Sequence, residues 1–426
     1  MVAAMSTSPV WVSRAKMAAR SISQCLALAL TLMAPVPALS APYTDGVIFP
    51  TAVDREQALL EFYAEWKSLY VVQACGEGRY FVKVDADGKA VGGGAEAATI
   101  TVSEAHGYGM LLTVMMAKTD PKAQVIFDGM LRYFHDHPAA SDPGLMAWNQ
   151  VTGCSNATTV QGENSATDGD LDIGYSLLLA DKAWGSAGAF NYRAEALKVL
   201  AAILDKEVSG DVLLIGDWAK TGDGGAYSAT TRASDFMVSH FKAFADATND
   251  PRWLAIRDRV YATISRVGSQ HSSHTGLMPD FIVGMPNDPA PAPSQFLEGE
   301  NDGDYSWNSG RYPWRIALDY LLYGEPRAKM ALAPLTGWAK SIARGDPRAF
   351  ADTYRLDGTT YPRHGTNSMA YVPMLGVAAM LDPASQSWLD AVWADAASMR
   401  LADEDYFGNT LKLLGMVAMT GHWATP

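Results

Sequence analysis

Polar residues gather in four short stretches of this sequence, each at the expected start of an apolar helix. The stretches read TVSEAHGYG (101–109), NSATDGDLDIG (164–174), RASDFMVSHF (232–241) and NSGRYPWR (308–315). The first three carry carboxylates, and together the four combine acidic side chains with arginine and aromatic residues. Two carboxyl groups suffice to hydrolyse a glycosidic bond, because one protonates the leaving oxygen while the other activates water or attacks the sugar carbon. The residue types therefore indicate acid–base chemistry on a carbohydrate, and we expect no metal or organic cofactor.

Two of these stretches also have a purely structural interpretation. Thr101 and Glu104 form a T-x-x-E pattern, which is typical of a capping box at the start of a helix. Asp168 is a candidate helix N-cap, with Asp170 and Asp172 placed to stabilise the helix dipole. The D-x-D-x-D run lacks the glycine and the glutamate that a calcium loop requires, so it predicts no metal site. Both interpretations of Glu104 and Asp168 stay open at this point.

Apolar residues recur mostly at helical spacing, and alternating strand-like runs are scarce. We expect twelve helices, at residues 54–71, 103–117, 121–137, 168–184, 190–207, 233–247, 250–266, 308–323, 325–343, 366–381, 384–400 and 403–420. Those at 103–117, 168–184 and 366–381 are apolar nearly all the way round, whereas their partners have one polar face. A helix that is apolar all round is buried, and a two-faced helix lies outside it. Six inner helices alternating with six outer ones predict an all-α fold, the (α/α)6 barrel.

Two long insertions interrupt the helices, at residues 208–232 and 267–306, and insertions of this length are usually functional or mobile. A solenoid of helix pairs is the alternative architecture, but no fixed-period repeat is visible. Nothing marks a linker, so we expect a single catalytic domain over residues 41–426. If alternate helices run in one direction, the polar stretches all lie at one mouth of the barrel.

Residues 1–40 are typical of a signal peptide. They contain no Asp or Glu, three basic residues precede the run CLALALTLMAPVPALS, and small residues around Ser40 offer a cleavage point. The run is too short to span a membrane, and two prolines break it. We expect a secreted or periplasmic protein that has no membrane association after signal removal. Cys75 and Cys154 then remain, and sequence leaves open whether they form a disulfide.

The composition excludes several classes of protein. Hydrophobic residues make up 48% of the 426 residues and charged residues 19%, which argues against disorder. With 33 Lys and Arg against 46 Asp and Glu the net charge is −13, and loss of the three basic signal residues gives −13 − 3 = −16. Nucleic acids and anionic membranes need basic surfaces, so neither is an expected partner. A neutral or cationic polymer fits better, and we expect a monomer.

The second polar stretch carries a family resemblance. ATDGDLDIGYSLLLADKAW (166–184) closely resembles the characteristic segment of glycoside hydrolase family 8, with Gly174 where Ala is usual. SEAHGYGM (103–110) and RYPWRIALDY (311–320) are similar to two further blocks of that family. The resemblance spans about residues 54–420. It implies a glycosidase with an (α/α)6 barrel, in agreement with the helix count.

The resemblance also implies roles for single residues. Glu104 matches the general acid, a role that demands a carboxyl kept protonated by burial or by a neighbouring negative charge. Asp168 matches a residue that holds the sugar at the cleavage point and is often labelled a nucleophile, and we expect it to distort the ring and bind hydroxyl groups. Trp148 resembles a stacking platform for a sugar, with a buried core tryptophan as the alternative. Arg311 is a further expected substrate contact.

The general base is where the sequence departs from many family members. They carry Asp in a Y-D-A-x-R-x-P-W-R block, but here the block reads W-N-S-G-R-Y-P-W-R, with Asn308 in that place. An amide does not deprotonate water at neutral pH. One branch of the family shares this Asn and uses a Glu from the insertion just upstream, which implies Glu298 or, in a looser setting, Glu300. Asn308 and Asp235 are expected to contact substrate.

These roles predict a reaction that inverts the configuration at the anomeric carbon, with the acid and base carboxyls about 6.5–9.5 Å apart. The branch with Asn308 contains endoglucanases acting on β-1,4- or mixed-linked glucans, and chitosanases. We therefore expect an exported endo-acting hydrolase of cellulose or mixed-linked β-glucan. A chitosanase is the alternative, because an acidic surface attracts polycationic chitosan. Xylan is a third candidate substrate. The alternative from another functional class is a non-catalytic accessory protein for carbohydrate binding or cellulose assembly.

Overall fold

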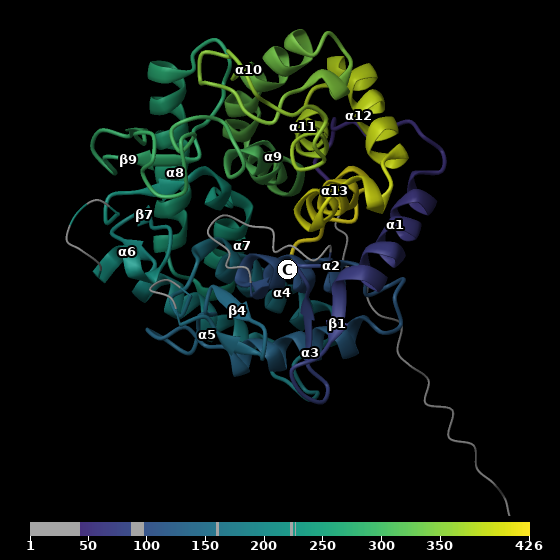
Figure 1. Cartoon of the computed structure of the whole chain (residues 1–426), viewed down its shortest axis with the longest axis vertical. Helices are drawn as coiled ribbons and strands as arrows, with labels where there is room; N and C mark the ends of the chain where they lie inside the picture. The colour runs from purple at the N-terminus through teal and green to yellow at the C-terminus, as the bar shows by residue number, and fades with distance from the viewer. Residues whose placement is uncertain (1–42, 87–97, 159–161, 222–224, 226) are drawn as a thin grey trace, which may run out of the picture. The chain divides into compact units, whose positions relative to one another are not determined.

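The computed structural model describes residues 43–86, 98–158, 162–221, 225 and 227–426, so the expected signal peptide lies outside the described ranges. The inner helices are α2 (Ser103–Met115), α4 (Thr167–Trp184), α7 (Val238–Thr248), α9 (Tyr312–Tyr323), α11 (Val372–Ala379) and α13 (Tyr406–Met419). The outer helices are α1 (Arg55–Tyr70), α3 (Ala123–Asp136), α5 (Tyr192–Lys206), α8 (Arg252–His271), α10 (Pro326–Ile342) and α12 (Gln386–Ser398). Figure 1 shows the two rings.

The inner helices form a closed ring. Each packs against the next, in the order α2, α4, α7, α9, α11 and α13, and α13 packs back against α2. Helix α4 is buried on nearly every side from Thr167 to Ala180, whereas outer helix α5 buries only one face. The all-round apolar pattern thus places a helix inside, and the predicted (α/α)6 barrel is confirmed.

Each of the twelve predicted ranges overlaps one α-helix, but some boundaries were wrong. Helix α8, for example, continues to His271, beyond the predicted end at residue 266. Helix α11 begins at Val372 and not at 366, because residues 351–366 pair through isolated bridges in a long loop. Short 3-10 helices were not predicted: η1 (Ala233–Asp235), η2 (Ser309–Arg311), η3 (Pro347–Ala349), η4 (Pro383–Ser385) and η5 (Leu401–Asp403). The first insertion holds a short unpredicted helix, α6 (Asp217–Thr221).

Short antiparallel strands fill the connections between helices. They are β1 (Val71–Gln73), β2 (Tyr80–Val82), β3 (Thr99–Val102), β4 (Asn149–Val151), β5 (Ser155–Asn156), β6 (Val208–Ser209), β7 (Val212–Leu213), β8 (Thr231–Arg232), β9 (Phe281–Val283) and β10 (Ala290–Pro291). Strand β3 pairs with β4 and runs directly into α2. The N–H of Ser103 also donates to the carbonyl of Trp148 at 3.0 Å. This ladder fixes Glu104 beside Trp148.

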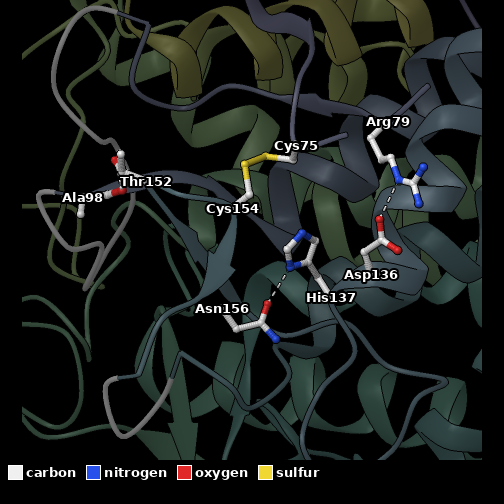
Figure 2. The surroundings of a disulfide bond; sticks show 8 residues. All are labelled: Cys75, Arg79, Ala98, Asp136, His137, Thr152, Cys154 and Asn156. Carbon is white, nitrogen blue, oxygen red and sulfur yellow. Dashed lines mark hydrogen bonds and ion pairs between the residues drawn. A yellow bond between two sulfur atoms is a disulfide. The ribbon is translucent and has the colours of Figure 1, made fainter. Parts of the chain in front are cut away.

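Cys75 and Cys154 form a disulfide with a Cα–Cα distance of 5.5 Å. It joins the turn between β1 and β2 to the turn between β4 and β5, as Figure 2 shows. The question that sequence left open is therefore answered, and the strand that follows Trp148 is covalently attached to a second hairpin.

Two glycines let α2 and α4 approach closely near the mouth of the barrel. A Cβ on Gly169 would lie 2.6 Å from the backbone carbon of Ser103, and one on Gly107 would lie 2.9 Å from Cβ of Asp172. Any side chain at these positions would push the helices apart. The glycines therefore allow the first turns of α2 and α4, which carry Glu104 and Asp168, to lie side by side.

The C-terminal residues pack inside the ring, where Figure 1 places the C-terminus. Trp423 is fully buried and packs edge-on against Trp314 of α9 at 5.3 Å between ring centroids. The Tyr175 hydroxyl of α4 donates to the carbonyl of Ala424 at 2.8 Å. No helix within the described ranges combines the length and hydrophobicity needed to cross a bilayer.

Candidate active site

A pocket of about 510 Å³ lies at the N-terminal ends of inner helices. Residues that line it come from the first turns of α2, α4 and α13, from η2, and from both predicted insertions. Six of the seven residues predicted for the site line this pocket: Glu104, Trp148, Asp168, Glu298, Asn308 and Arg311. Polar segments up to about 200 residues apart in sequence thus meet at one mouth, as expected from helices that run in one direction.

Glu104 occupies the second position of α2, and its carboxylate accepts a hydrogen bond from Arg311. The capping-box interpretation was wrong, because the N-cap is Val102 and no side chain caps this helix. Burial raises the pKa of Glu104 to about 7, with Arg311 acting against the rise and Asp168 adding to it. The carboxyl therefore holds its proton in weakly acidic solution.

Asp168, in contrast, is held ionised. Arg232 contacts its Oδ1 at 3.0 Å and Arg311 its Oδ2 at 3.2 Å, and the N–H of Gly169 donates to Oδ1 at 3.0 Å. Burial alone raises the pKa of Asp168, but the two guanidinium groups outweigh burial and hold that pKa below its usual value. The N-cap of α4 is Ala166, so the N-cap interpretation of Asp168 was also wrong.

Arg311 and Asn308 connect Glu104 to the second insertion. Arg311 donates through Nη1 to Glu104 and through Nη2 to Oδ1 of Asn308 at 2.8 Å. Asn308 in turn donates through Nδ2 to Oε2 of Glu298 at 2.8 Å. The amide of Asn308 thus binds a carboxylate on one side and an arginine on the other. We call Glu104, Arg311, Asn308 and Glu298 the acid–base chain.

Glu298 lies on a loop that Asp302 holds in place. The carboxylate of Asp302 accepts from the N–H groups of Leu297 at 2.7 Å, Glu298 at 3.1 Å and Gly299 at 2.9 Å. Phe296 anchors the loop, since its ring lies 5.2 Å from that of Tyr227. Glu298 remains exposed in the pocket, as does Glu300. The structure therefore brings both candidate bases to the site, with Glu298 alone joined to Asn308.

Asp235 is the predicted site residue that does not line the pocket. It is fully buried, and it accepts hydrogen bonds from Nε of Arg232 at 3.0 Å and from Ser234 at 2.7 Å. Burial raises the pKa of Asp235 to about 6, although Arg232 acts against the rise. Asp235 is therefore placed to orient Arg232. No group of His, Cys, Asp and Glu in the described ranges is arranged to hold a metal ion.

Comparison with known proteins identifies the family. The sequence profile of glycosyl hydrolases family 8 matches residues 54–421. The chain belongs to glycosyl hydrolase family 8. This family 8 enzyme is 42% identical to a β-glucanase of Niallia circulans over 388 residues, which cover 90% of each protein. It is 36% identical to an endoglucanase of Bacillus sp. (strain KSM-330) over 391 residues, covering 90% of this chain and 80% of that one.

A solved structure gives the same result for this family 8 enzyme. The apo structure of a β-1,3-1,4-glucanase from Paenibacillus sp.X4 superposes with a TM-score of 0.84 at 40% sequence identity. The match covers 92% of this chain and 100% of that one. Fold and family therefore agree with the resemblance that the motifs carried.

Sequence reasoning missed several residues of the family 8 site. Arg232 was within reach, since it opens the third polar stretch and precedes Asp235 by three residues. Asp280 lines the pocket and accepts hydrogen bonds from the N–H of Ser309 at 2.7 Å and of Asn308 at 3.2 Å. A lone aspartate inside a polar insertion gives no signal of its own. The aromatic residues Trp218, Trp307 and Phe407 also line the pocket.

Proposed function

We propose that this family 8 enzyme is an exported endo-β-glucanase that cleaves β-1,4 bonds in mixed-linked β-glucan or cellulose with inversion at the anomeric carbon. The observation that carries the proposal is the acid–base chain, which runs from the buried Glu104, whose pKa is raised to about 7, through Arg311 and Asn308 to Glu298. An inverting glycosidase needs one carboxylic acid and one carboxylate on opposite sides of the scissile bond.

In this mechanism Glu104 is the general acid. Its raised pKa, about 7, leaves the carboxyl protonated at weakly acidic pH, so that it can donate to the leaving glycosidic oxygen. Arg311 then stabilises the carboxylate that forms, because the two groups are already hydrogen-bonded. The proton returns from solvent after the products leave.

Glu298 is the general base. It accepts a proton from a water molecule whose oxygen attacks the anomeric carbon, while the bond to the leaving oxygen breaks. The hydrogen bond from Asn308 fixes one carboxylate oxygen and leaves the other for the water. Asn308 thereby orients the carboxylate that replaces the aspartate of other family members.

Asp168 and the aromatic residues hold the sugar. Asp168 stays ionised beside Arg232 and Arg311, so it can accept hydrogen bonds from sugar hydroxyl groups and favour a distorted ring. Trp148 is half-buried in the pocket lining, a placement that suits stacking against one face of a sugar.

The relatives support β-glucan as the substrate, because the proteins at 42% and 36% identity are a β-glucanase and an endoglucanase. Chitosan is the second candidate. It is favoured by the net charge of −13 and by two exposed carboxylates in the pocket, Glu298 and Glu300. A non-catalytic accessory has no need for a buried, protonated Glu104 joined to a second carboxylate.

Export forms part of the proposal. The acid-free, basic and then apolar segment over residues 1–40 supports a cleaved signal peptide, and the Cys75–Cys154 disulfide supports an oxidising compartment. We propose that residues 41–426 form a single, monomeric catalytic domain. N-terminal sequencing of the protein recovered outside the cytoplasm tests export, with a start near Ala41 expected.

The deciding experiment measures reducing-sugar release from carboxymethyl cellulose, mixed-linked β-glucan and chitosan. We expect the highest kcat/KM on mixed-linked β-glucan, and proton NMR should detect the α-anomer as the first product. Glu298→Gln should lower kcat by about 10² or more, the usual contribution of a general base, while Glu300→Gln changes it by less than about tenfold.

Azide provides the matched control for the base. In Glu298→Ala a small anion can enter the vacated space and attack without a base, so azide should restore turnover and give an α-glycosyl azide. Rescue of Glu300→Ala instead would assign the base to Glu300. No sugar release from any of the three polymers by the wild type would refute the proposed activity.

A further inference from the structure

Three buried carboxyl groups lie behind the pocket and take no part in the mechanism above. Asp170 of α4 and Glu207, the C-cap of α5, are fully inaccessible, and Asp217 of α6 is nearly so. Burial raises the pKa of Glu207 to about 8 and raises that of Asp170 well above its usual value. Glu207 adds to the rise for Asp170, whereas the hydrogen bond with Asp170 lowers the pKa of Glu207.

These carboxyl groups bind three segments that line the pocket. We call residues 146–148, 165–168 and 215–218 the tryptophan wall, because Trp148 and Trp218 belong to it and line the pocket. Asp170 accepts from the N–H of Met146 at 2.8 Å. Glu207 accepts from the hydroxyl of Ser165 at 2.5 Å, and Asp217 accepts from the N–H of Ser165 at 2.9 Å.

The Asp170 and Glu207 carboxyls are hydrogen-bonded to each other. Apart from each other, the buried oxygens Oδ2 of Asp170 and Oε2 of Glu207 have no hydrogen-bond partner within the described part of the chain. A hydrogen bond between two carboxyl oxygens needs a proton, and in a site without a neighbouring cation two touching carboxylates cannot both be ionised.

We propose that Asp170 and Glu207 share one proton, and that this carboxyl pair is a positioning element that holds the tryptophan wall in place for the sugar chain. The inference rests on the proposed glucanase function, because it concerns how the same pocket binds its polymer. Neither residue touches substrate. They act through Met146 and Ser165 of the wall, which lie two and three residues before the pocket-lining Trp148 and Asp168.

The charged groups around the Asp170–Glu207 pair determine how it responds to pH. Asp217 faces it from α6 and Asp235 faces Glu207 from η1, and Asp235 is neutralised by Arg232. Both of these neighbouring groups are acidic. Glu207 ionises first, near its pKa of about 8, while Asp170, whose pKa the charge of Glu207 raises, keeps the shared proton. Above that pH the pair therefore carries a negative charge beside Asp217, which repels it, and the wall loosens.

The test compares the wild-type pair with amides that cannot ionise. In Glu207→Gln the amide N–H₂ donates to Asp170 and the amide oxygen still accepts from Ser165. In Asp170→Asn the amide oxygen still accepts from Met146 and the N–H₂ donates to Glu207. Both changes therefore keep the hydrogen bonds and remove the shared proton. Asp128→Asn on α3 is the matched control, because burial raises the pKa of Asp128 at a site away from the pocket lining.

Binding of cellohexaose is followed by tryptophan fluorescence in a Glu104→Gln background, which prevents cleavage. With the pair intact, the Kd should rise by roughly tenfold between about pH 7 and about pH 9, which is the change expected when one hydrogen bond is lost. In the Glu207→Gln and Asp170→Asn backgrounds the Kd should stay level, and the Asp128→Asn background should behave as the wild-type pair does.

Thermal unfolding gives a second readout that needs no ligand. The folded pair keeps protons that the unfolded chain releases, so the Tm of the wild type should fall as the pH rises from about 5 to about 8. It should go on falling above that pH, because the pKa of Asp170 is raised as well. The Tm of Glu207→Gln should fall less across that window. This arm stands even if no polymer is hydrolysed and the proposed function fails.

Equal pH dependence of Tm in wild type and both amide variants would overturn the shared proton. A difference in Tm without any difference in Kd would overturn the positioning role and leave the pair as part of the core.

Discussion

At the scale of single residues, Glu104 lies between opposing influences. Burial and the charge of Asp168 favour the neutral carboxyl, while Arg311 and Arg232 favour the carboxylate. The balance puts the pKa of Glu104 near 7, which is far above that of an exposed glutamate. Activity that depends on a protonated Glu104 must therefore decline as the pH rises past that value.

We predict that kcat on mixed-linked β-glucan falls tenfold per pH unit above about pH 7, where Glu104 loses its proton. Glu104→Gln should lower kcat by about 10³ and change KM little, since an amide cannot donate a proton to the leaving oxygen. An aryl cellobioside with an acidic phenol leaves without protonation, so its hydrolysis should fall far less in Glu104→Gln. An equal loss on both substrates would contradict the role of general acid.

A second prediction concerns Asn308. The change Asn308→Asp places a carboxylate against Glu298, where the amide now donates at 2.8 Å, with Asp280 close behind. Two carboxylates in contact raise each other's pKa, so the acidic limb of the kcat profile should move to higher pH and kcat near pH 6 should drop by about tenfold. Steady-state kinetics from pH 4 to 8 measures the shift, and an unchanged profile would show that Asn308 does not hold Glu298 in solution.

At the scale of elements, the hairpins beside the mouth are joined to the end of α3 as well as to each other. Arg79 of the β1–β2 hairpin pairs with Asp136 at 2.8 Å, and His137 contacts Asn156 of β5 at 2.9 Å. Figure 2 shows both contacts in the surroundings of the disulfide. The β4–β5 hairpin that follows Trp148 is thus joined to the residue after α3 as well as to the β1–β2 hairpin.

We predict that Cys75→Ser with Cys154→Ser lowers the free energy of unfolding by about 4 kcal/mol, because the bond closes a loop of 79 residues. Since the β3–β4 ladder and the contacts of His137 remain, kcat/KM at 25 °C should change by less than about threefold. Denaturant melts and initial rates measure the two effects. Wild type treated with a reductant should match the double variant.

The elements also show what sequence can predict here. Amphipathic and all-round apolar patterns located every long helix and the inner and outer rings, because burial in a barrel dictates both patterns. Motifs led to the residues that converge at the mouth. Asp280 and α6 were missed, because they lie in Gly- and Pro-rich insertions that show no periodicity and reach the pocket only on folding. Trp307 directly follows the second insertion, and it was missed because a single aromatic residue in a sequence does not reveal whether it lines a pocket or packs in the core. The start of α11 was placed too early because its upstream loop is held by isolated bridges and not by helical spacing.

At the scale of the whole molecule, layers of side chains fill the ring beneath the pocket. Asp172 accepts from both guanidinium nitrogens of Arg315, at 2.9 and 2.6 Å, and from His240 at 3.0 Å. Tyr175 stacks on His240, and Trp423 closes the layer below. The buried ion pair between Asp172 and Arg315 is thus part of the packed layer that supports the acidic site.

We predict that Trp423→Ala lowers the free energy of unfolding by about 3–5 kcal/mol, the usual cost of a cavity left by a buried tryptophan. The change should leave KM within about twofold, because Trp423 does not line the pocket. Urea melts and KM on mixed-linked β-glucan test both parts. Trp423→Phe, which keeps an aromatic ring against Trp314, should recover about half of the loss.

The C-terminal residues that fill the ring also constrain how a polysaccharide can bind. Because Trp423 and Ala424 are buried inside the ring, a polysaccharide cannot pass through the centre of the barrel. We therefore expect it to lie across the pocket, with both of its ends in solvent. An enzyme that binds the middle of a polymer does not need to find a chain terminus, so a single cleavage can divide a long molecule. The viscosity of a glucan solution should therefore fall sharply well before much soluble sugar accumulates.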